Sequence, residues 1–319
     1  MTLLPDHPRH THAVVIGAGT MGADVAVVLA RGGCRVTVTD PSPARRAELA
    51  PRTLDALTSL GLAERAANVQ AVADLSDVAW ADVALVIECI PENLGAKQAL
   101  FAKLVQLAPA HTVLTSNSSS FPISAIGEGL TGQARMLGLH FFMPAHLVPL
   151  VEVVMGPQTD EANAQRLISY MRGCGSVPVL VRKDKPGFLA NRLQHALARE
   201  AFAMMDEGVA TAEDVDAAVR FGFGFRYLAA GPVLQRDHAG LDVHCAAAAT
   251  MYPSLSNADH PARVLQDQVN AGRLGMKAGA GFFDWPEDRR LAEKARYNTL
   301  LKQGLALLAD ELPPLDRSF

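Results

Sequence analysis

The sequence predicts an α/β domain with a mostly parallel sheet, followed by an all-α domain. From residue 13 to residue 181, short and almost wholly apolar segments of strand length alternate with longer, helix-like segments. Beyond Pro186 the strand pattern ends and a long apolar-periodic helix follows. The charged stretch Arg182–Lys185 separates the two patterns. We therefore predict two domains, at residues 1–184 and 185–319.

A glycine-rich turn follows the first predicted strand. Ala13–Ile16 is a short apolar run typical of a buried parallel strand, and Gly17-Ala-Gly-Thr-Met-Gly22 leads from it into a helix-like segment. Between a strand and a helix, such glycines admit close backbone approach, and the helix N-terminus faces a pyrophosphate. The predicted cofactor contacts in this turn are Gly17, Gly19, Thr20, Met21 and Gly22.

The second predicted strand ends in an acid. Arg35–Asp40 is apolar at alternate positions, and Asp40 lies where a carboxylate accepts from a ribose 2′-OH and repels a 2′-phosphate. The pattern thus indicates a Rossmann-type dinucleotide-binding domain that uses NAD rather than NADP. Arg45 and Arg46 weaken that preference, although arginines on a helix surface usually face water.

The remaining elements follow in order. Further strands are predicted at Val83–Cys89, Thr112–Thr115, Met136–His140, Val151–Val154 and Val177–Val181. Helices are predicted at Ala44–Ala67 (interrupted near Pro51 and Gly61), Lys97–Leu107, Glu161–Cys174 and Phe188–Gly208, with another starting at the capping box Thr211–Asp214. The polar run Ser116–Ser120 follows a strand, at the sheet edge where ligands bind in such domains.

Composition excludes several classes of function. Hydrophobic residues make up 49% of the chain and charged residues 19%, as in a compact enzyme. A net charge of −4 with scattered basic residues predicts no nucleic-acid partner. No apolar run approaches the roughly 18 residues that span a membrane, and no export signal precedes the first strand. The four cysteines lie far apart, which predicts a cytoplasmic protein without a metal site.

One histidine and one acid lie inside apolar segments close together in the chain. His140 ends the run Gly138-Leu-His-Phe-Phe, and Glu152 lies between Val151 and Val153. Ionisable groups are costly to bury unless they are paired. A carboxylate that orients an imidazole is the usual arrangement of a general base. On these residues alone, a satisfied core histidine beside an unrelated glutamate is the more common explanation.

Six segments in a fixed order resemble the 3-hydroxyacyl-CoA dehydrogenase family over nearly the whole chain. They are Gly17–Gly22, Glu88–Asn93, Ser116–Ser120, Gly138–Phe142 with Glu152, Pro186–Arg192 and Gly275–Phe282. The resemblance implies NAD as cofactor, a homodimer formed by the helical domain, and a small-molecule substrate. It also implies catalytic roles for His140, Glu152, Ser119 and Asn191. The implied NAD contacts are Asp40, Glu92, Lys97, Ser119 and Lys277.

Two departures from the family pattern concern the substrate. Met143 stands where the family usually has an asparagine near the nicotinamide. The segment between Asp40 and Glu88 is shorter than in acyl-CoA members, whose helical arm there holds CoA with a lysine and a serine. This sequence has no lysine between Asp40 and Lys97.

The second domain offers two candidate substrate residues. His195 lies four residues after Asn191, on the same predicted helix face, although a packing or interface histidine is the more common explanation. Arg226, in a connection that resembles relatives acting on CoA-free hydroxy acids such as gulonate or carnitine dehydrogenases, would pair with a substrate carboxylate. A surface ion pair is the alternative for Arg226.

Three functions are weighed on this basis. The first is NAD-dependent oxidation of a short-chain 3-hydroxyacyl-CoA of the 3-hydroxybutyryl-CoA type, as in fatty acid metabolism, and the sequence favours it narrowly. The second keeps this chemistry on a small CoA-free hydroxy acid or alcohol of the gulonate, carnitine or pyridine-alcohol type. The third is a non-catalytic, NAD-binding, crystallin-like protein, against which intact His140, Glu152, Ser119 and Asn191 argue. Other β-hydroxyacid dehydrogenases use a catalytic lysine where this chain has Asn191.

Overall fold

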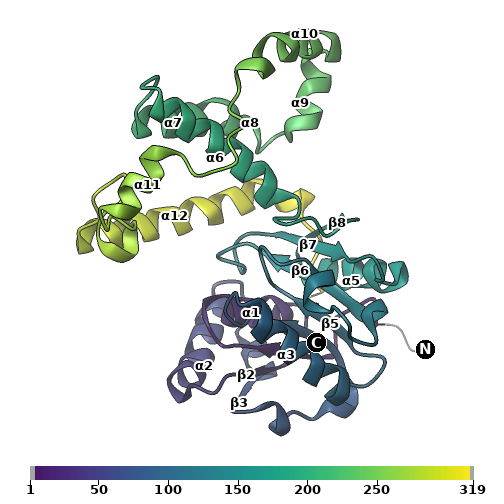
Figure 1. The fold of residues 1–319 in the computed structure, drawn as a ribbon. Helices are drawn as coiled ribbons and strands as arrows, with labels where there is room; N and C mark the ends of the chain where they lie inside the picture. Colours follow the sequence, from purple (N-terminus) through teal and green to yellow (C-terminus); the bar gives the residue numbers. More distant parts are fainter. Residues whose placement is uncertain (1–3, 317–319) are drawn as a thin grey trace. The chain divides into compact units, whose positions relative to one another are not determined.

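The computed structural model describes residues 4–316, which form two compact units (Figure 1). The first comprises residues up to Asn191 together with the described residues from Asp310 onward, and the second comprises Arg192–Ala309. The C-terminal segment thus packs with the first unit, whereas the sequence analysis grouped it with the second. The domain boundary after residue 184 stays a prediction.

One eight-stranded sheet forms the centre of the first unit. Its strand order is β3-β2-β1-β4-β5-β6-β7-β8, and the first six strands in that order run parallel. β7 runs antiparallel to β6, and β8 runs parallel to β7. The predicted Rossmann-type fold is confirmed. The strands are β1 (His12–Ile16), β2 (Arg35–Thr39), β3 (Val69–Val72), β4 (Val83–Glu88), β5 (Val113–Ser116), β6 (Met136–Phe141), β7 (Leu150–Met155) and β8 (Val177–Val181).

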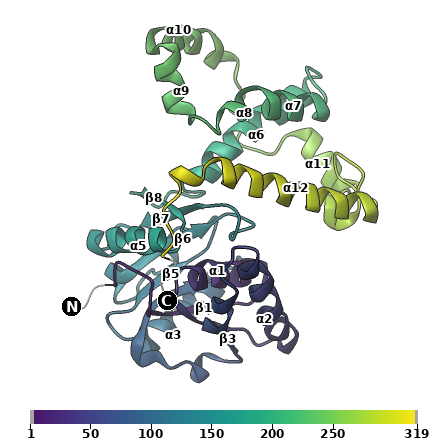
Figure 2. The same ribbon diagram turned by 180° about the vertical axis from the view of Figure 1, so that it is seen from behind.

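Helices cover both faces of this sheet because alternate strand residues are apolar on both sides. Ala13 and Val15 of β1 join one core cluster, while Val14 and Ile16 join the other. The first cluster takes its helical side chains from α1, α2 and α5, which Figure 2 shows from behind, and the second from α3 and α4. These helices are α1 (Thr20–Arg31), α2 (Pro43–Thr58), α3 (Leu94–Leu107), α4 (Ile123–Ile126) and α5 (Glu161–Gly173).

Two elements of the first unit differ from the sequence expectation. β3 is absent from the predicted set because Val-Gln-Ala-Val is short and half polar. Pro51 does not interrupt α2, which continues through it. Leu49, Thr53 and Leu57 are buried at four-residue spacing, so packing holds the helix. Pro51 itself is exposed, on a helix face where water can hydrate the carbonyl left without a donor.

The second unit is helical, as predicted. Within residues 192–309 the only extended pairings are isolated bridges at Gly275, Ala280 and Asp284. The predicted capping box at Thr211 and Asp214 is present, and Gly208 has the positive φ of a helix-ending glycine. The helices are α6 (Ala190–Asp206, which starts in the first unit), α7 (Ala212–Ala218), α8 (Gly224–Arg226), α9 (Pro232–Ala239), α10 (Leu241–Met251), α11 (Arg263–Asn270) and α12 (Glu287–Leu307).

Single turns complete the chain. The 3-10 turns are η1 (Ala63–Asn68), η2 (Leu75–Asp77), η3 (Trp80–Asp82), η4 (Gln133–Arg135), η6 (Tyr252–Ser254), η7 (Met276–Ala278) and η8 (Ala309–Glu311), and η5 (Val219–Phe223) is a π-helical turn. Among residues 4–316, no helix is long and apolar enough to cross a membrane.

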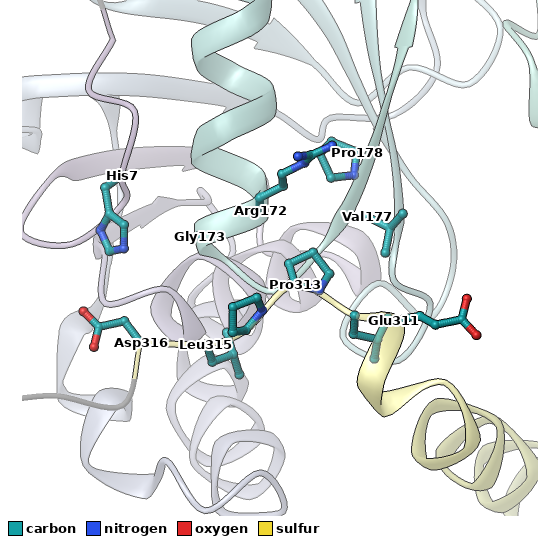
Figure 3. A pocket seen from close by; sticks show the side chains of 11 residues that line it. His7, Arg172, Gly173, Val177, Pro178, Glu311, Pro313, Leu315 and Asp316 are labelled. Carbon is teal, nitrogen blue, oxygen red and sulfur yellow. The ribbon is translucent and has the colours of Figure 1, made fainter.

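The C-terminal segment borders an open pocket of about 720 Å³ in the first unit (Figure 3). Pro313 and Leu315 form one wall, and Arg172 of α5 with Pro178 of β8 lie across from them. None of the residues predicted to bind cofactor or substrate lines this pocket. The candidate active site therefore lies elsewhere, at the ends of β1, β4, β5 and β6.

Candidate active site

His140 and Glu152 form a buried pair across two strands. They are direct partners in the antiparallel register of β6 and β7, so their side chains project from the same face of the sheet. His140 Nδ1 lies 2.7 Å from Glu152 Oε2, with Glu152 fully buried and His140 4% exposed. The carboxylate accepts, so Nδ1 carries the proton and Nε2 is the basic nitrogen. The contact is present; its catalytic role stays a prediction.

The second oxygen of Glu152 holds the start of α6. Oε1 accepts hydrogen bonds from the backbone N–H groups of Leu189 (3.0 Å) and Ala190 (2.7 Å). These are orphan donors at a helix N-terminus, where a carboxylate is favoured. Asn191 is the second residue of α6. One buried carboxylate thus fixes both the imidazole and the turn that carries Asn191.

Aromatic rings surround the imidazole. Phe142 and Phe188 meet His140 edge to face, with ring centroids 4.6 Å and 5.6 Å away. Phe188 is buried and has a positive φ of 49°, an uncommon conformation for a bulky residue. The apolar surroundings strengthen the interaction between His140 and Glu152, because water does not screen it.

The loop after β5 contacts the end of β6. Asn117 Oδ1 accepts from the N–H of Phe141 at 2.9 Å, and its own N–H donates to the carbonyl of Glu88. Asn117 therefore fixes the residue after His140. Ser119, two residues farther on, is exposed and forms no hydrogen bond to the rest of the described chain. Its hydroxyl is thus available to a ligand, as its predicted role requires.

The glycine-rich turn has the shape that a dinucleotide needs. Gly17 has φ 103°, and a Cβ there would lie 2.8 Å from the carbonyl of Cys89. A Cβ on Gly22 would collide with the carbonyl of Gly17, whereas Gly19 faces open space. The N–H groups of Thr20 and Met21 begin α1, whose cap Gly19 provides no side chain. These residues fit a pyrophosphate at the helix N-terminus.

Asp40 follows β2 and is more enclosed than the sequence suggested. It is 2% exposed, and its carboxylate accepts from the N–H groups of Ala18 and Ser42, both at 2.8 Å. Burial alone would raise the pKa of Asp40, but these bonds and Arg45, 3.6 Å away, outweigh it and leave the pKa below its usual value. Asp40 is therefore a carboxylate that holds the turn; its ribose contact stays a prediction.

Glu92 and Lys97 belong to an ionic network that runs from the buried Glu88 and Lys97 to the exposed Glu92. Lys97 is 1% exposed, and its Nζ lies 2.7 Å from Glu88 and 3.3 Å from Glu92. Glu92 also accepts from the hydroxyls of Ser118 (2.6 Å) and Ser120 (2.7 Å). Burial opposes ionisation, yet the two serines and Lys97 lower the pKa of Glu92 to about 2. Here Lys97 positions Glu92, and its predicted contact with NAD stays a prediction.

Three predicted residues lie in the second unit. His195 on α6, Arg226 on α8 and Lys277 on η7 are all exposed side chains. Exposure leaves each of them able to meet a ligand. Their predicted roles in substrate or cofactor binding stay predictions.

Met143 stands in the connection from β6 to β7 and is 65% exposed. The peptide bond that follows it, to Pro144, is cis. A thioether cannot donate a hydrogen bond, so Met143 presents an apolar surface where the family usually has an amide. The residues that sequence reasoning missed around the site are Asp24, Asn117 and Phe188.

Comparison with known proteins identifies the family. The family model of the 3-hydroxyacyl-CoA dehydrogenase NAD binding domain matches residues 12–185, and that of the C-terminal domain matches residues 187–285. The chain belongs to the 3-hydroxyacyl-CoA dehydrogenase family. It is an NAD-dependent dehydrogenase that acts on a CH–OH group, as predicted.

Two sequence relatives differ in the substrate that their names state. The 5-formyl-3-hydroxy-2-methylpyridine 4-carboxylate 5-dehydrogenase of Mesorhizobium japonicum is 34% identical over 88% of this chain and 94% of its own length. The 3-hydroxyadipyl-CoA dehydrogenase of Escherichia coli is 37% identical over 94% of this chain but 62% of its own length. Sequence identity therefore does not decide the substrate.

Solved structures add a structural comparison. A 5-formyl-3-hydroxy-2-methylpyridine 4-carboxylic acid 5-dehydrogenase, an NAD⁺-dependent dismutase, has a TM-score of 0.87 at 32% identity, covering 93% of this chain and 98% of its own. The (S)-3-hydroxybutyryl-CoA dehydrogenase of Ralstonia eutropha has a TM-score of 0.71 at 27% identity, covering 86% of this chain and 99% of its own.

Proposed function

We propose that this enzyme oxidises a small CoA-free hydroxy compound, with a carboxylated pyridine alcohol or a comparable hydroxy acid as substrate class. The observation that carries the proposal is the connection from β2 to β4. It consists of α2, single turns and β3, with no second helix beside α2 and no lysine before Lys97. The helical arm that would hold a CoA moiety is thus missing. The TM-score of 0.87 to a pyridine-carboxylate dehydrogenase also supports a CoA-free substrate.

The chemistry follows from the residues at the site. Bound NAD would supply a nicotinamide ring that accepts a hydride. His140 Nε2 would take the hydroxyl proton, and Glu152 would stabilise the imidazolium that forms. Ser119 and Asn191 would donate hydrogen bonds to the substrate oxygen as its charge increases. Arg226 would pair with a substrate carboxylate, and His195 would contact the substrate.

Oxidation of a short-chain 3-hydroxyacyl-CoA, with a role in fatty acid metabolism, is the second candidate function. Its support is the match to both family domains and the 37% identity to an acyl-CoA enzyme. Arg45, Arg46 and Arg52 of α2 would then have to replace the missing lysine. All three already have partners, since Arg45 lies 3.6 Å from the carboxylate of Asp40, Arg46 donates to the carbonyl of Asp40 and Arg52 pairs with Asp24.

A substrate panel tests the proposal. NADH formation is followed with a carboxylated pyridine alcohol, gulonate, carnitine and free 3-hydroxybutyrate, beside 3-hydroxybutyryl-CoA. We expect kcat/KM for at least one CoA-free compound to exceed that for the thioester by about tenfold or more, equivalent to ~1.4 kcal/mol of transition-state binding. A thioester that outperforms every CoA-free compound would favour the second candidate instead.

We propose further that the second unit is completed by another copy of this chain in a homodimer. Within residues 192–309, only Ala230 and Gly281 are buried, although a unit of this size normally has its own core. Most of the exposed large apolar side chains of the described chain belong to this unit, including Phe221, Val233 and Leu241. Apolar surface on this scale is typical of an obligate interface.

Dimerisation is tested by charge insertion. We expect a dimer in sedimentation or light scattering, with a thermal midpoint that rises with protein concentration. Val233→Glu should yield monomer, because Val233 is 77% exposed in this surface. Leu54→Glu, at an exposed leucine of the first unit, is the matched control and should remain dimeric. A concentration-independent monomer would contradict the proposal.

We also propose a cytoplasmic location. Its support is the chemistry of the thiols: Cys34, Cys89, Cys174 and Cys245 are all free. Burial raises the pKa of Cys34 to about 11, which keeps it a neutral packing residue rather than a nucleophile. Free thiols persist in a reducing compartment.

A further inference from the structure

Asp24 is a buried acid in the middle of an apolar helix. It lies two residues after Gly22 in α1 and is 1% exposed. A carboxylate in such a place is costly unless its oxygens have partners. Asp24 has no role in the proposed reaction, so the reason for burying its carboxylate lies in the groups that it binds.

The partners of Asp24 come from two distant segments of the first unit. Oδ1 accepts from Arg52 Nη2 of α2 at 2.5 Å, and Oδ2 accepts from the N–H of Ala145 at 3.1 Å. His146 Nδ1 lies 3.2 Å from Oδ1, an ion-pair distance without hydrogen-bond geometry. Arg52 also donates to the carbonyl of Thr20 at 3.2 Å. The network thus joins α1, α2 and residues 142–149, the connection from β6 to β7.

The electrostatics keep Asp24 ionised. Burial would raise its pKa, but His146 and Arg52 outweigh that effect and leave the pKa of Asp24 below its usual value. The hydrogen bond to the N–H of Ala145 is therefore charge-assisted, and such bonds are about twice as strong as neutral ones. The anchor on the connection is a strong one.

The strand order indicates which half of a bound dinucleotide lies near the connection 142–149. Asp40 follows β2, on one side of β1, whereas β4, β5 and β6 follow in order on the other side. A dinucleotide whose pyrophosphate sits at α1 and whose adenosine half lies at Asp40 has its nicotinamide half on the side of β4 to β6. The connection 142–149 starts next to His140 and returns to α1, so it has to span the positions of β4 and β5.

We propose that Asp24 is a positioning residue that anchors the connection 142–149 over the nicotinamide half of the cofactor site. The inference rests on the proposed roles of His140 and of the glycine-rich turn. Asp24 acts through Ala145 and so fixes the connection that carries Met143 beside the reacting atoms. The adenosine half of the site does not depend on it.

Binding of NADH and binding of ADP together distinguish the nicotinamide half of the cofactor site from the adenosine half, because ADP lacks the nicotinamide. Binding of NADH and of ADP is measured by calorimetry or fluorescence, which needs no substrate. Because a charged hydrogen bond is lost, we expect Asp24→Ala to weaken NADH binding about tenfold or more while ADP binding stays within about twofold. Asp24→Asn keeps an acceptor for Ala145 but loses the charge and the bond from Arg52, so it should recover only part of the NADH affinity.

Two further variants keep the test decisive. Arg52→Met removes the partner of Asp24 from a side chain that is 40% exposed, so it should fold and weaken NADH binding in the same selective way. Thr53→Val is the matched control, since its hydroxyl bonds only to the carbonyl of Leu49 within α2. It should leave both affinities unchanged. Equal losses of NADH and ADP binding in Asp24→Ala, or no loss of either, would overturn the inference. Failure of the substrate panel would leave it intact.

Discussion

Replacing His140 by alanine is expected to lower kcat by about 10²–10⁴-fold, the usual contribution of a positioned general base. Among the described residues, His140 is the only histidine that pairs with a fully buried glutamate. The carboxylate of Glu152 holds the proton on Nδ1 and leaves Nε2 to act as the base. NADH binding should change little, because the proposed contacts of the cofactor's adenosine and pyrophosphate are made elsewhere. Steady-state kinetics with the best substrate of the panel provide the measurement.

A control variant accompanies His140→Ala. His260→Ala removes an exposed histidine that pairs only with its neighbour Asp259, and it should retain full activity. Near-full turnover by His140→Ala would exclude His140 as the base.

Burial of ionisable groups is visible in a sequence pattern, which made His140 and Glu152 candidates, and the resemblance to the family made their pairing the prediction. His140 and Glu152 each lie inside an apolar strand. The two strands are consecutive in the chain and joined by a short connection, so they pair as antiparallel neighbours. Asp24 was not predicted, although it is also an acid in an apolar helix. Its partners, however, lie 28 and 121 residues away, and no local rule connects them.

Other contacts of the site depend on which strands are neighbours in the sheet, and this order cannot be read from the sequence. Asn117 was visible as a member of a polar run, but its bond to Phe141 depends on β5 and β6 being neighbours in the sheet. Lys97 was predicted to contact the cofactor, and its pairing with Glu88 inside the first unit was not foreseen; the cofactor contact stays a prediction. A lysine on a helix is usually solvated, and only the three-dimensional position of Glu88 changes that expectation.

The secondary structure was also predicted where neighbouring residues determine it and missed where contacts with distant residues determine it. Strands with continuous apolar runs, such as β1 and β4, were predicted because such runs indicate burial on both faces. β3 was missed because an edge strand needs few apolar residues. The predicted break at Pro51 was wrong, since the buried face of α2 outweighs one missing backbone hydrogen bond.

Replacing Glu152 should have two separable effects, because each of its oxygens has a different partner. A carboxylate accepts on both sides, towards His140 and towards the N–H groups of Leu189 and Ala190. The amide of Glu152→Gln has one accepting oxygen and one donating nitrogen. With its oxygen kept at α6, its NH₂ faces Nδ1 and moves the imidazole proton to Nε2, so the base is lost while the helix start is kept.

We therefore expect Glu152→Gln to lower kcat by about 10²–10⁴-fold, as for loss of the base itself, with little change in thermal midpoint. Glu152→Ala should lose as much activity and also remove the acceptor of the part-buried N–H groups of Leu189 and Ala190, at about 1–3 kcal/mol each. Its thermal midpoint should fall by about 1–2 °C for each kcal/mol lost, because the entropy of unfolding grows with chain length. Glu161→Gln, at an exposed glutamate of α5, is the control and should match the wild type. Equal midpoints for the Gln and Ala variants would contradict the capping role of Glu152. Full activity in the Gln variant would contradict its role in orienting His140.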